Sequence, residues 1–340
     1  MLAGSLSNIS VRLRRATWFA LGFVSLAGIG WVLLGRLPPI VEPSDRRLRP
    51  ANAAAAMALM DSIRAGEGQD VNSACRSRII VADTTTGAPV VILLHGFTNC
   101  PKQFDRLAAD LAKAGYNVVL PRVPRHGMAD RMTSDLQYLR AEDLERAGQT
   151  AIDIASGFGG SITVVGLSSS AVLAGWLAQH RPEVKCAVLL APAFAPPGVP
   201  APVARRLTCA MLRLPNFFMW WDPRVRADLP GPRQCYPRFA SHALAEVYRL
   251  GFTVLGDASR ARPKARRIVL VTTPLDTAVN NDLGLELVRR WRARGASVET
   301  YDFAREQGVL HDMVDPEQPY QRTEVTYPVI ERLVTASAKP

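Results

Sequence analysis

The sequence predicts an α/β protein built on a doubly wound, mostly parallel sheet. Short runs rich in β-branched residues alternate with stretches of helical composition about 10 to 15 residues long. Such alternation is typical of parallel strands whose connecting helices cover both faces of one sheet. Ligands of such a sheet bind beyond the carboxyl ends of its strands, so functional residues are expected in the segments that follow the strands.

The expected elements alternate along most of the chain. Strands are expected at residues 77–82, 90–94, 117–121, 162–166, 187–191, 267–272 and 297–302. Helices are expected at residues 51–65, 104–114, 141–155, 169–179 and 282–294, and near 327–336. Gly66 and Gly115 close the first two helices, as glycine commonly does. We expect residues 66–340 to form one domain.

The alternation is interrupted between the strands at 187–191 and 267–272. About residues 194–256 are rich in proline, arginine and aromatic residues. A structureless loop of this length is not expected inside a compact domain. We therefore predict an inserted cap with its own helices, whose aromatic side chains pack mostly with one another.

The amino-terminal segment predicts a membrane anchor that precedes the domain. Residues 16–35 hold no charged side chain, and a helix of that length is about 30 Å long, the thickness of a hydrocarbon core. Residues 1–15 form a basic flank, and residues 36–65 are expected to form a linker and a helix. A cleaved signal peptide and a buried core helix are the alternatives; a signal peptide has an apolar run of about 7 to 15 residues.

The positive charge of the chain is concentrated in two places. The 340 residues include 41 Lys and Arg and 30 Asp and Glu, a formal net charge of +11. Residues 1–50 contribute +5 and residues 201–267 contribute +9, which leaves the rest of the chain at −3. Such a charge by itself suggests nucleic acid, but the sequence holds no recognisable nucleic-acid-binding motif. Nucleic acid is therefore not an expected partner.

The cysteines predict disulfides. Cys186 lies in an apolar run and is expected to be buried, whereas the other four lie in polar or loop-like sequence. We predict the pairs Cys75–Cys100 and Cys209–Cys235, although four cysteines allow three connectivities. Disulfides favour a location outside the cytosol, in the periplasm or at the cell exterior, with secretion if the amino-terminal segment is cleaved. No metal is expected, because close Cys or His pairs are absent from the sequence.

A nucleophilic serine is predicted at Ser168. The residues Val-Val-Gly-Leu-Ser-Ser-Ser at 164–170 follow an expected strand and open an expected helix. This is the context of a nucleophile elbow, a sharp turn that exposes a serine hydroxyl and requires small neighbours. The usual Gly-x-Ser-x-Gly pattern ends here in Ser170, which is also small.

An acid and a base follow Ser168 in the chain order that this arrangement requires. Asp276 lies just past the strand expected at 267–272, and His311 follows the next expected strand. Asp282 and Asp302 are the alternative acids.

The residues after the strand at 90–94 predict an oxyanion loop. His95, Gly96 and Phe97 stand at its carboxyl end, and the backbone amides of Phe97 and Ser169 are the expected oxyanion donors. His95 is expected to support the loop through hydrogen bonds.

These motifs resemble those of the α/β-hydrolase family, and within it those of bacterial carboxylesterases and monoacylglycerol lipases. The likeness covers about residues 75–335; its most specific parts are Leu-Leu-His-Gly-Phe-Thr-Asn-Cys-Pro at 93–101, the loop at 121–127 and the loop that carries His311. The resemblance implies the α/β-hydrolase fold and a serine hydrolase that cleaves carboxylic esters through an acyl-enzyme intermediate, without a cofactor. Ser168 would be the nucleophile, Asp276 the orienting acid and His311 the base.

The expected substrate is a small or lipid-like ester with an apolar acyl part, and the expected membrane contact is through the amino-terminal helix. An acyltransferase or a peptidase uses the same triad. A non-catalytic binding protein can keep the same fold, but it would lack a member of the triad, and none is missing from the sequence.

Overall fold

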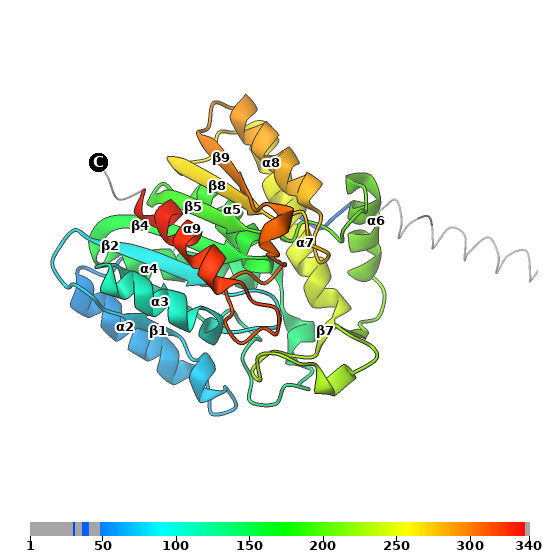
Figure 1. The fold of residues 1–340 in the computed structure, drawn as a ribbon, viewed down its shortest axis with the longest axis horizontal. Helices are drawn as coiled ribbons and strands as arrows, with labels where there is room; N and C mark the ends of the chain where they lie inside the picture. The colour runs from blue at the N-terminus through cyan, green and yellow to red at the C-terminus, as the bar shows by residue number, and fades with distance from the viewer. Residues whose placement is uncertain (1–29, 31–35, 41–47, 337–340) are drawn as a thin grey trace, which may run out of the picture.

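A seven-stranded sheet forms the centre of the protein, with strand order β1-β3-β2-β4-β5-β8-β9 (Figure 1). The computed structural model describes residues 30, 36–40 and 48–336. The strands are β1 (Arg78–Ile80), β2 (Ala88–Leu94), β3 (Asn117–Leu120), β4 (Gly159–Leu167), β5 (Val184–Leu190), β8 (Arg267–Thr272) and β9 (Val298–Asp302). Only β1 pairs antiparallel, along β3, and the other pairs in this sheet are parallel. The predicted mostly parallel sheet is confirmed.

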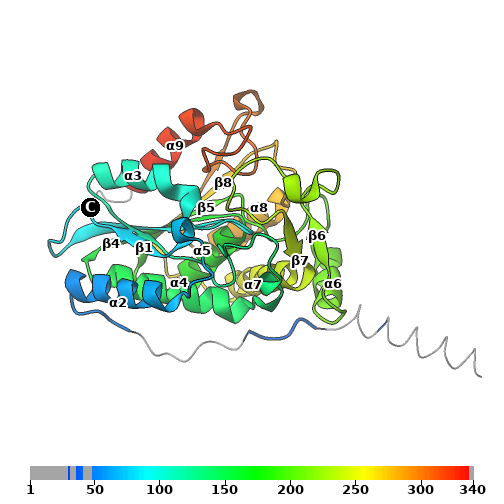
Figure 2. The same cartoon turned by 90° about the horizontal axis from the view of Figure 1, so that it is seen from below.

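Helices cover both faces of this sheet (Figure 2). One face carries α3 (Asp105–Lys113) and α9 (Thr323–Thr335), and the other carries α2 (Ala53–Gly66), α4 (Ala141–Ser156), α5 (Ser169–His180) and α7 (Ser241–Arg260). The last large helix, α8 (Asn281–Ala293), packs against α7. Almost every residue of α5 is buried, because this helix lies between the sheet and α7. Its first residue follows Ser168, so the predicted nucleophile stands at the start of a buried helix.

The segment between β5 and α7 contains α6 (Ala201–Met211), β6 (Phe218–Trp220), η4 (Arg226–Asp228) and β7 (Arg238–Ala240). β6 and β7 form a separate two-stranded antiparallel ribbon. Helix α7 begins inside the stretch that was expected to form the cap, but it packs against α5 and α8. It therefore extends the helical layer of the main sheet.

The prediction of a transmembrane helix is wrong for the fold as it is described. Residues 16–35 lie outside the described residues except for residue 30, and no helix of the described chain is long and apolar enough to cross a membrane. The twenty-residue α7 has sufficient length, but it carries Glu246, Arg249 and Asp257. Length and apolarity must coincide in one helix for it to span a bilayer.

One of the two predicted disulfides forms. Cys75 and Cys100 are joined, which confirms that pair. The structure does not join Cys209 to Cys235, so the second pair is wrong. Cys209 is buried within α6, whereas Cys235 lies in the loop before β7 and lines a cavity that Cys209 does not reach. Loop-like sequence on either side of two cysteines does not fix the distance between them, which a disulfide requires to be short.

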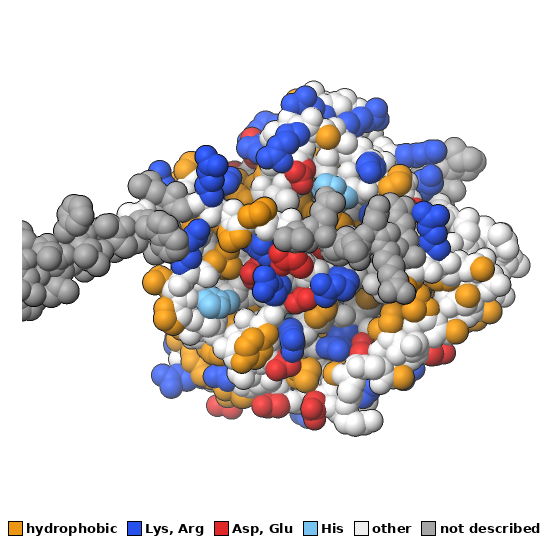
Figure 3. Space-filling model, turned by 180° about the vertical axis from the view of Figure 1, so that it is seen from behind, with side chains coloured by type: hydrophobic (Ala, Val, Ile, Leu, Met, Phe, Trp, Pro, Cys, Tyr) orange, Lys and Arg blue, Asp and Glu red, His pale blue; other side chains and the backbone are white. Residues whose placement is uncertain are grey.

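Basic and acidic side chains are interspersed over the face that carries α2, α4 and α7 (Figure 3). Exposed ion pairs on these helices include Arg146 with Asp143 on α4 and Arg260 with Asp257 on α7. This face therefore presents mixed charge and not a continuous basic stripe of the kind that follows a phosphate backbone.

Candidate active site

The turn between β4 and α5 holds Ser168 in a strained conformation. Its backbone has φ of 57° and ψ of −115°, a region that a non-glycine residue rarely adopts. The turn is tight at Gly166, where a Cβ atom would lie only 2.1 Å from the Ser170 carbonyl oxygen. These features are those of a nucleophile elbow, in which a small residue two positions before the serine lets the strand and the helix approach.

Ser170 replaces the second glycine of the usual motif and makes a contact that glycine could not. Its hydroxyl donates a hydrogen bond to the carbonyl oxygen of His95, in the loop after β2. Ser170 is buried there, and its small side chain fits the space between elbow and loop. The departure from the motif thus connects the nucleophile turn to the oxyanion loop, a link that the sequence motif did not reveal.

Ser168, His311 and Asp276 lie in one chain of hydrogen bonds. The Nε2 atom of His311 is 2.9 Å from Ser168 Oγ, and its Nδ1 atom is 2.7 Å from Asp276 Oδ2. The Asp276 side chain is fully buried, and its Oδ1 accepts from the amides of Ala278 and Val279 at 2.8 and 3.2 Å. These bonds hold the carboxyl group in place, so that it orients the ring with Nε2 facing the serine hydroxyl.

The alternative acids lie elsewhere. Asp302 accepts a hydrogen bond from Thr272 Oγ1, and Asp282 lies in the first turn of α8. Among the described residues, Asp276 is the carboxylate that bonds to the His311 ring. The structure therefore selects Asp276 from the three candidates.

The predicted oxyanion donors, the backbone amides of Phe97 and Ser169, lie in the two segments that the Ser170–His95 hydrogen bond joins. Phe97 belongs to the loop that follows β2, and Ser169 is the first residue of α5. Within the described part of the chain, neither amide donates to a protein acceptor. Unpaired amides at the start of a helix and in an adjacent loop can stabilise a developing negative charge.

His95 supports the oxyanion loop as a neutral side chain. Its Nε2 accepts from the Val123 amide at 3.0 Å, so its Nδ1 carries the proton and donates to the Gly96 carbonyl, also at 3.0 Å. Burial, followed by the field of the neighbouring His126, holds the pKa of His95 well below its usual value. The ring is therefore a fixed hydrogen-bonding bridge between two backbone segments, as predicted.

A cavity of about 210 Å³ opens onto Ser168 and His311. The cap contributes most of its apolar wall, through Trp221, Leu229, Pro230, Pro232 and Tyr236. Asn99, Gln103 and Asp312 are among the polar residues of the wall. The places of Trp221 and Tyr236 in this wall could not be predicted from the sequence, because aromatic residues in an inserted segment more often form its own core.

The cap is docked directly onto the oxyanion loop. Trp221 Nε1 donates to Thr98 Oγ1 at 3.0 Å, and the Tyr236 amide donates to the Thr98 carbonyl at 2.9 Å. The Phe97 ring contacts Trp221 edge to face. The cap residues that line the cavity therefore also contact the loop that carries Phe97, one of the predicted oxyanion donors.

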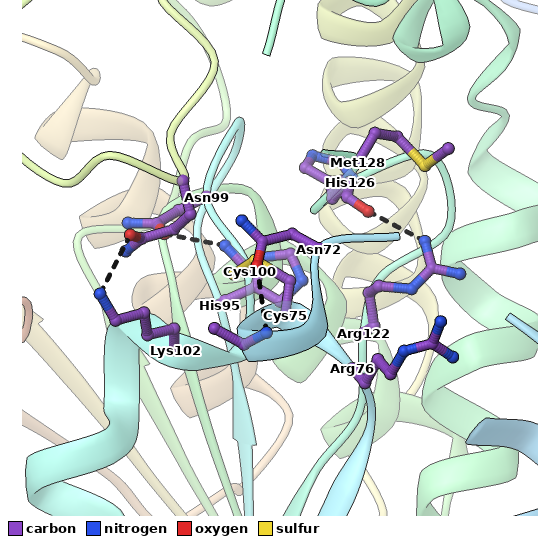
Figure 4. Close-up of a disulfide and its surroundings, with 12 residues drawn as sticks. Asn72, Cys75, Arg76, His95, Asn99, Cys100, Lys102, Arg122, His126 and Met128 are labelled. Carbon is purple, nitrogen blue, oxygen red and sulfur yellow. Dashed lines mark hydrogen bonds between the residues drawn. A yellow bond between two sulfur atoms is a disulfide. The ribbon is translucent and has the colours of Figure 1, made fainter. Parts of the chain in front are cut away.

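The buried Cys75–Cys100 disulfide also holds the oxyanion loop in place (Figure 4). It joins η1 (Ser73–Cys75) to the residue just before η2 (Pro101–Phe104) and packs against Gly127. A Cβ atom at Gly127 would lie 2.7 Å from the Cβ of Cys75, and its φ of 68° also favours glycine. The Arg122 guanidinium donates to the His126 carbonyl beside it, at 2.9 Å.

The fold and this arrangement of residues define a class of protein. A model of the Alpha/beta hydrolase family matches residues 91–323, well over half of the chain. The chain belongs to the α/β-hydrolase family, and the resemblance inferred from its motifs is confirmed.

One curated relative is the thermostable monoacylglycerol lipase of Bacillus sp. (strain H-257). It is 34% identical to this chain over 171 residues, which cover 47% of this chain and 60% of the relative. The matched region thus spans less than two thirds of that lipase.

Several solved structures share the fold. A metagenome-derived lipolytic enzyme superposes with a TM-score of 0.59 at 17% identity, over 78% of this chain and 99% of the other. The monoacylglycerol lipase of Paleococcus ferrophilus gives 0.55 at 16% identity, over 76% and 99% of the two chains. A soluble variant of the Saccharomyces cerevisiae monoglyceride lipase gives 0.56 at 14% identity, over 78% and 92%. At these identities the likeness concerns the fold alone.

Proposed function

We propose that this protein is a serine hydrolase that cleaves carboxylic esters through an acyl-enzyme intermediate. The observation that carries the proposal is the hydrogen-bonded chain from Ser168 through His311 to the buried Asp276. A serine hydroxyl becomes nucleophilic when an adjacent base takes its proton and a third group orients that base. The monoacylglycerol lipase activity of the Bacillus relative supports an ester as the substrate.

In the proposed reaction, neutral His311 accepts the Ser168 proton at Nε2 as Oγ attacks the ester carbonyl. The amides of Phe97 and Ser169 stabilise the negative charge on the carbonyl oxygen of the tetrahedral intermediate. The imidazolium then gives its proton to the leaving alcohol, and the serine is left acylated. A water molecule then gives a proton to His311 as its oxygen attacks the acyl carbonyl. The imidazolium returns this proton to Ser168 Oγ as the bond to the acyl group breaks, which releases the acid and restores the free serine.

The cavity favours an ester with a short apolar part beside the reacting carbonyl. Its volume of about 210 Å³ has room for roughly seven groups the size of a water molecule. Apolar and aromatic residues of the cap line most of it. Burial of a methylene group there contributes about 0.8 kcal/mol, until the chain becomes too long for the cavity.

Hydrolysis of p-nitrophenyl esters of increasing acyl length tests this proposal. We expect kcat/KM to rise to an optimum at about four to six carbons and to fall for longer chains, because the cavity then is full. The same esters in buffer with heat-unfolded protein serve as the control. A protein that cleaves no ester of the series contradicts the proposed activity, and a steady rise to long chains contradicts the proposed substrate size.

The proposed compartment lies outside the cytosol. The Cys75–Cys100 disulfide supports this location, because disulfides persist in oxidising environments and are rare in the cytosol.

A further inference from the structure

Two loops that carry the reacting groups meet in a buried network of side chains. The first is the oxyanion loop, residues 95–103, and the second is the base loop, residues 308–317. We propose that Gln103 and Asn99 are positioning residues that fasten these loops together and so hold the oxyanion donors at a fixed distance from His311. The inference rests on the proposed function, since it assigns a role in the reaction of that site.

Gln103 forms the first link through two hydrogen bonds, one to each loop. Its Oε1 accepts from the Gly96 amide at 2.8 Å, next to the predicted donor Phe97. Its Nε2 donates to Asp312 Oδ2 at 2.8 Å, next to His311. Only a primary amide offers an acceptor and a donor in this geometry, since a carboxylate has no donor. Gln103 is almost fully buried, so water cannot substitute for either bond without a change in packing.

Asn99 makes the second link. Its Nδ2 donates to Asp315 Oδ2 at 3.0 Å, while its Oδ1 accepts from the amide of Cys100, one of the disulfide cysteines, at 2.8 Å (Figure 4). Asn99 and Asp315 are 2% and 1% exposed, so this contact is as dry as the protein core. Asn99 Nδ2 can donate to Asp315 whether or not this carboxyl group holds a proton, because a protonated carboxyl group keeps acceptor capacity.

Each loop is otherwise anchored to a different part of the molecule. The oxyanion loop is held by the cap and by the disulfide, through Thr98 and Cys100. The base loop is held by α9, where Thr326 Oγ1 donates to the Met313 carbonyl and the Tyr327 hydroxyl to that of Val314, at 2.7 and 2.8 Å. The two amide links join these anchors close to the reacting atoms. A displacement of about 1 Å between catalytic groups can lower a rate by roughly 100-fold.

The charges around the network explain why amides occupy these positions. Asp312 and Asp315 are close enough to interact, and Glu317 of the same loop is a third acidic side chain beside them. Cys235 of the cap and Tyr327 of α9 also face this group, and Lys102 pairs with Glu317 at the surface. A fourth carboxylate, at position 103, would therefore repel Asp312, whereas the amide of Gln103 donates a hydrogen bond to it.

The substitution Gln103→Glu tests the first link. The glutamate keeps an acceptor for the Gly96 amide but loses the donor to Asp312 and places two carboxylates in contact. We expect kcat to fall by about 30- to 100-fold with KM changed less than about threefold, because the oxyanion donors act in the transition state. The affinity for a boronic acid inhibitor, which mimics the tetrahedral intermediate, should fall with kcat.

A second substitution, Asp312→Asn, is added to Gln103→Glu to restore this hydrogen bond with its donor and acceptor exchanged. Gln318 Nε2 donates to the same Asp312 oxygen at 3.0 Å in the wild type, so the Gln318 amide turns to present its oxygen to the new amide. In the Gln103→Glu/Asp312→Asn protein the new amide then donates to the new carboxylate, and we expect kcat to recover to within about fivefold of the wild type. Lys102→Gln is the matched control, because Lys102 joins the same two loops through a pair with Glu317 that is exposed to solvent. Such pairs contribute little, so this variant should keep wild-type kcat.

The outcomes separate the two proposals. A wild-type protein without esterase activity contradicts the proposed function itself. An active wild type with an equally active, folded Gln103→Glu variant contradicts the positioning role. A low kcat that the Asp312→Asn change does not rescue, in a protein of normal thermal stability, also contradicts it, because the loss then does not come from the link.

Discussion

Asp276 and Asp315 are both buried near His311, but their different surroundings give the two carboxyl groups different properties. Asp276 accepts hydrogen bonds from two backbone amides and from the His311 ring, which fix its position. Asp315 is equally buried but faces Asp312, and burial followed by this neighbouring charge raises its pKa to about 7. Both aspartates are visible in the sequence, and Asp276 was predicted from its place after a strand. The role of Asp315 could not be predicted, because it depends on Asn99, more than two hundred residues away in the chain.

The raised pKa of Asp315 makes its contribution to stability depend on pH. Between its unfolded pKa of 3.8 and its folded pKa of about 7, the folded protein holds a proton that the unfolded chain has released. A rise of pH through this window therefore lowers the free energy of unfolding. An Asp315→Asn variant lacks this proton, so we expect the difference in unfolding free energy, variant minus wild type, to increase from pH 5 to pH 8 by roughly 3 kcal/mol.

Urea unfolding of both proteins at pH 5, 6, 7 and 8 measures this difference. His95 and His126 titrate in the opposite sense, since burial lowers the pKa of each, but both proteins contain them and their effect cancels. A difference that stays constant with pH would show that Asp315 does not take up a proton in this range.

At the scale of elements, the predictable part of the fold is the alternation of strand and helix. All seven strands of the main sheet were expected within a few residues, because buried parallel strands form continuous β-branched runs. The antiparallel direction of β1 was not predicted, since direction depends on pairing with β3 and leaves no local signal. The elbow was found from its position between β4 and α5, whereas the hydrogen bond of Ser170 to His95 depends on a loop distant in sequence.

The tight turn at Ser168 requires a residue without a side chain at position 166. In a Gly166→Ala variant the new methyl group would lie 2.1 Å from the Ser170 carbonyl oxygen, a backbone atom that cannot move without the turn. We expect the unfolding free energy to fall by about 3 kcal/mol and kcat/KM to fall by roughly 100-fold. Gly175→Ala on α5 is the control, because its nearest neighbour, a Leu189 side-chain atom at 3.4 Å, is at ordinary contact distance. Equal activity of the two variants in the ester assay would contradict the claim that the turn has no room for a side chain at position 166.

At the scale of the whole molecule, the main sheet and its helices could be predicted from the sequence, whereas the fold of the cap could not. The sheet, its helices and the order of serine, acid and base follow from local patterns and chain order. The cap does not, because its small ribbon and short helices acquire their places by packing on the oxyanion loop. The same limit explains the wrong Cys209–Cys235 pair, since neither residue carries a local signal of its distance from the other.

The central claim is that Ser168 is the nucleophile of an ester hydrolase, and covalent labelling tests it most directly. The wild-type protein is treated with a fluorophosphonate, digested and examined by mass spectrometry, beside a Ser168→Ala variant whose thermal unfolding is compared with the wild type. We predict one adduct per chain, located on Ser168, with loss of ester hydrolysis in proportion to labelling, and no adduct on the variant. Equal labelling of the folded variant, or an adduct on another residue, would contradict the account.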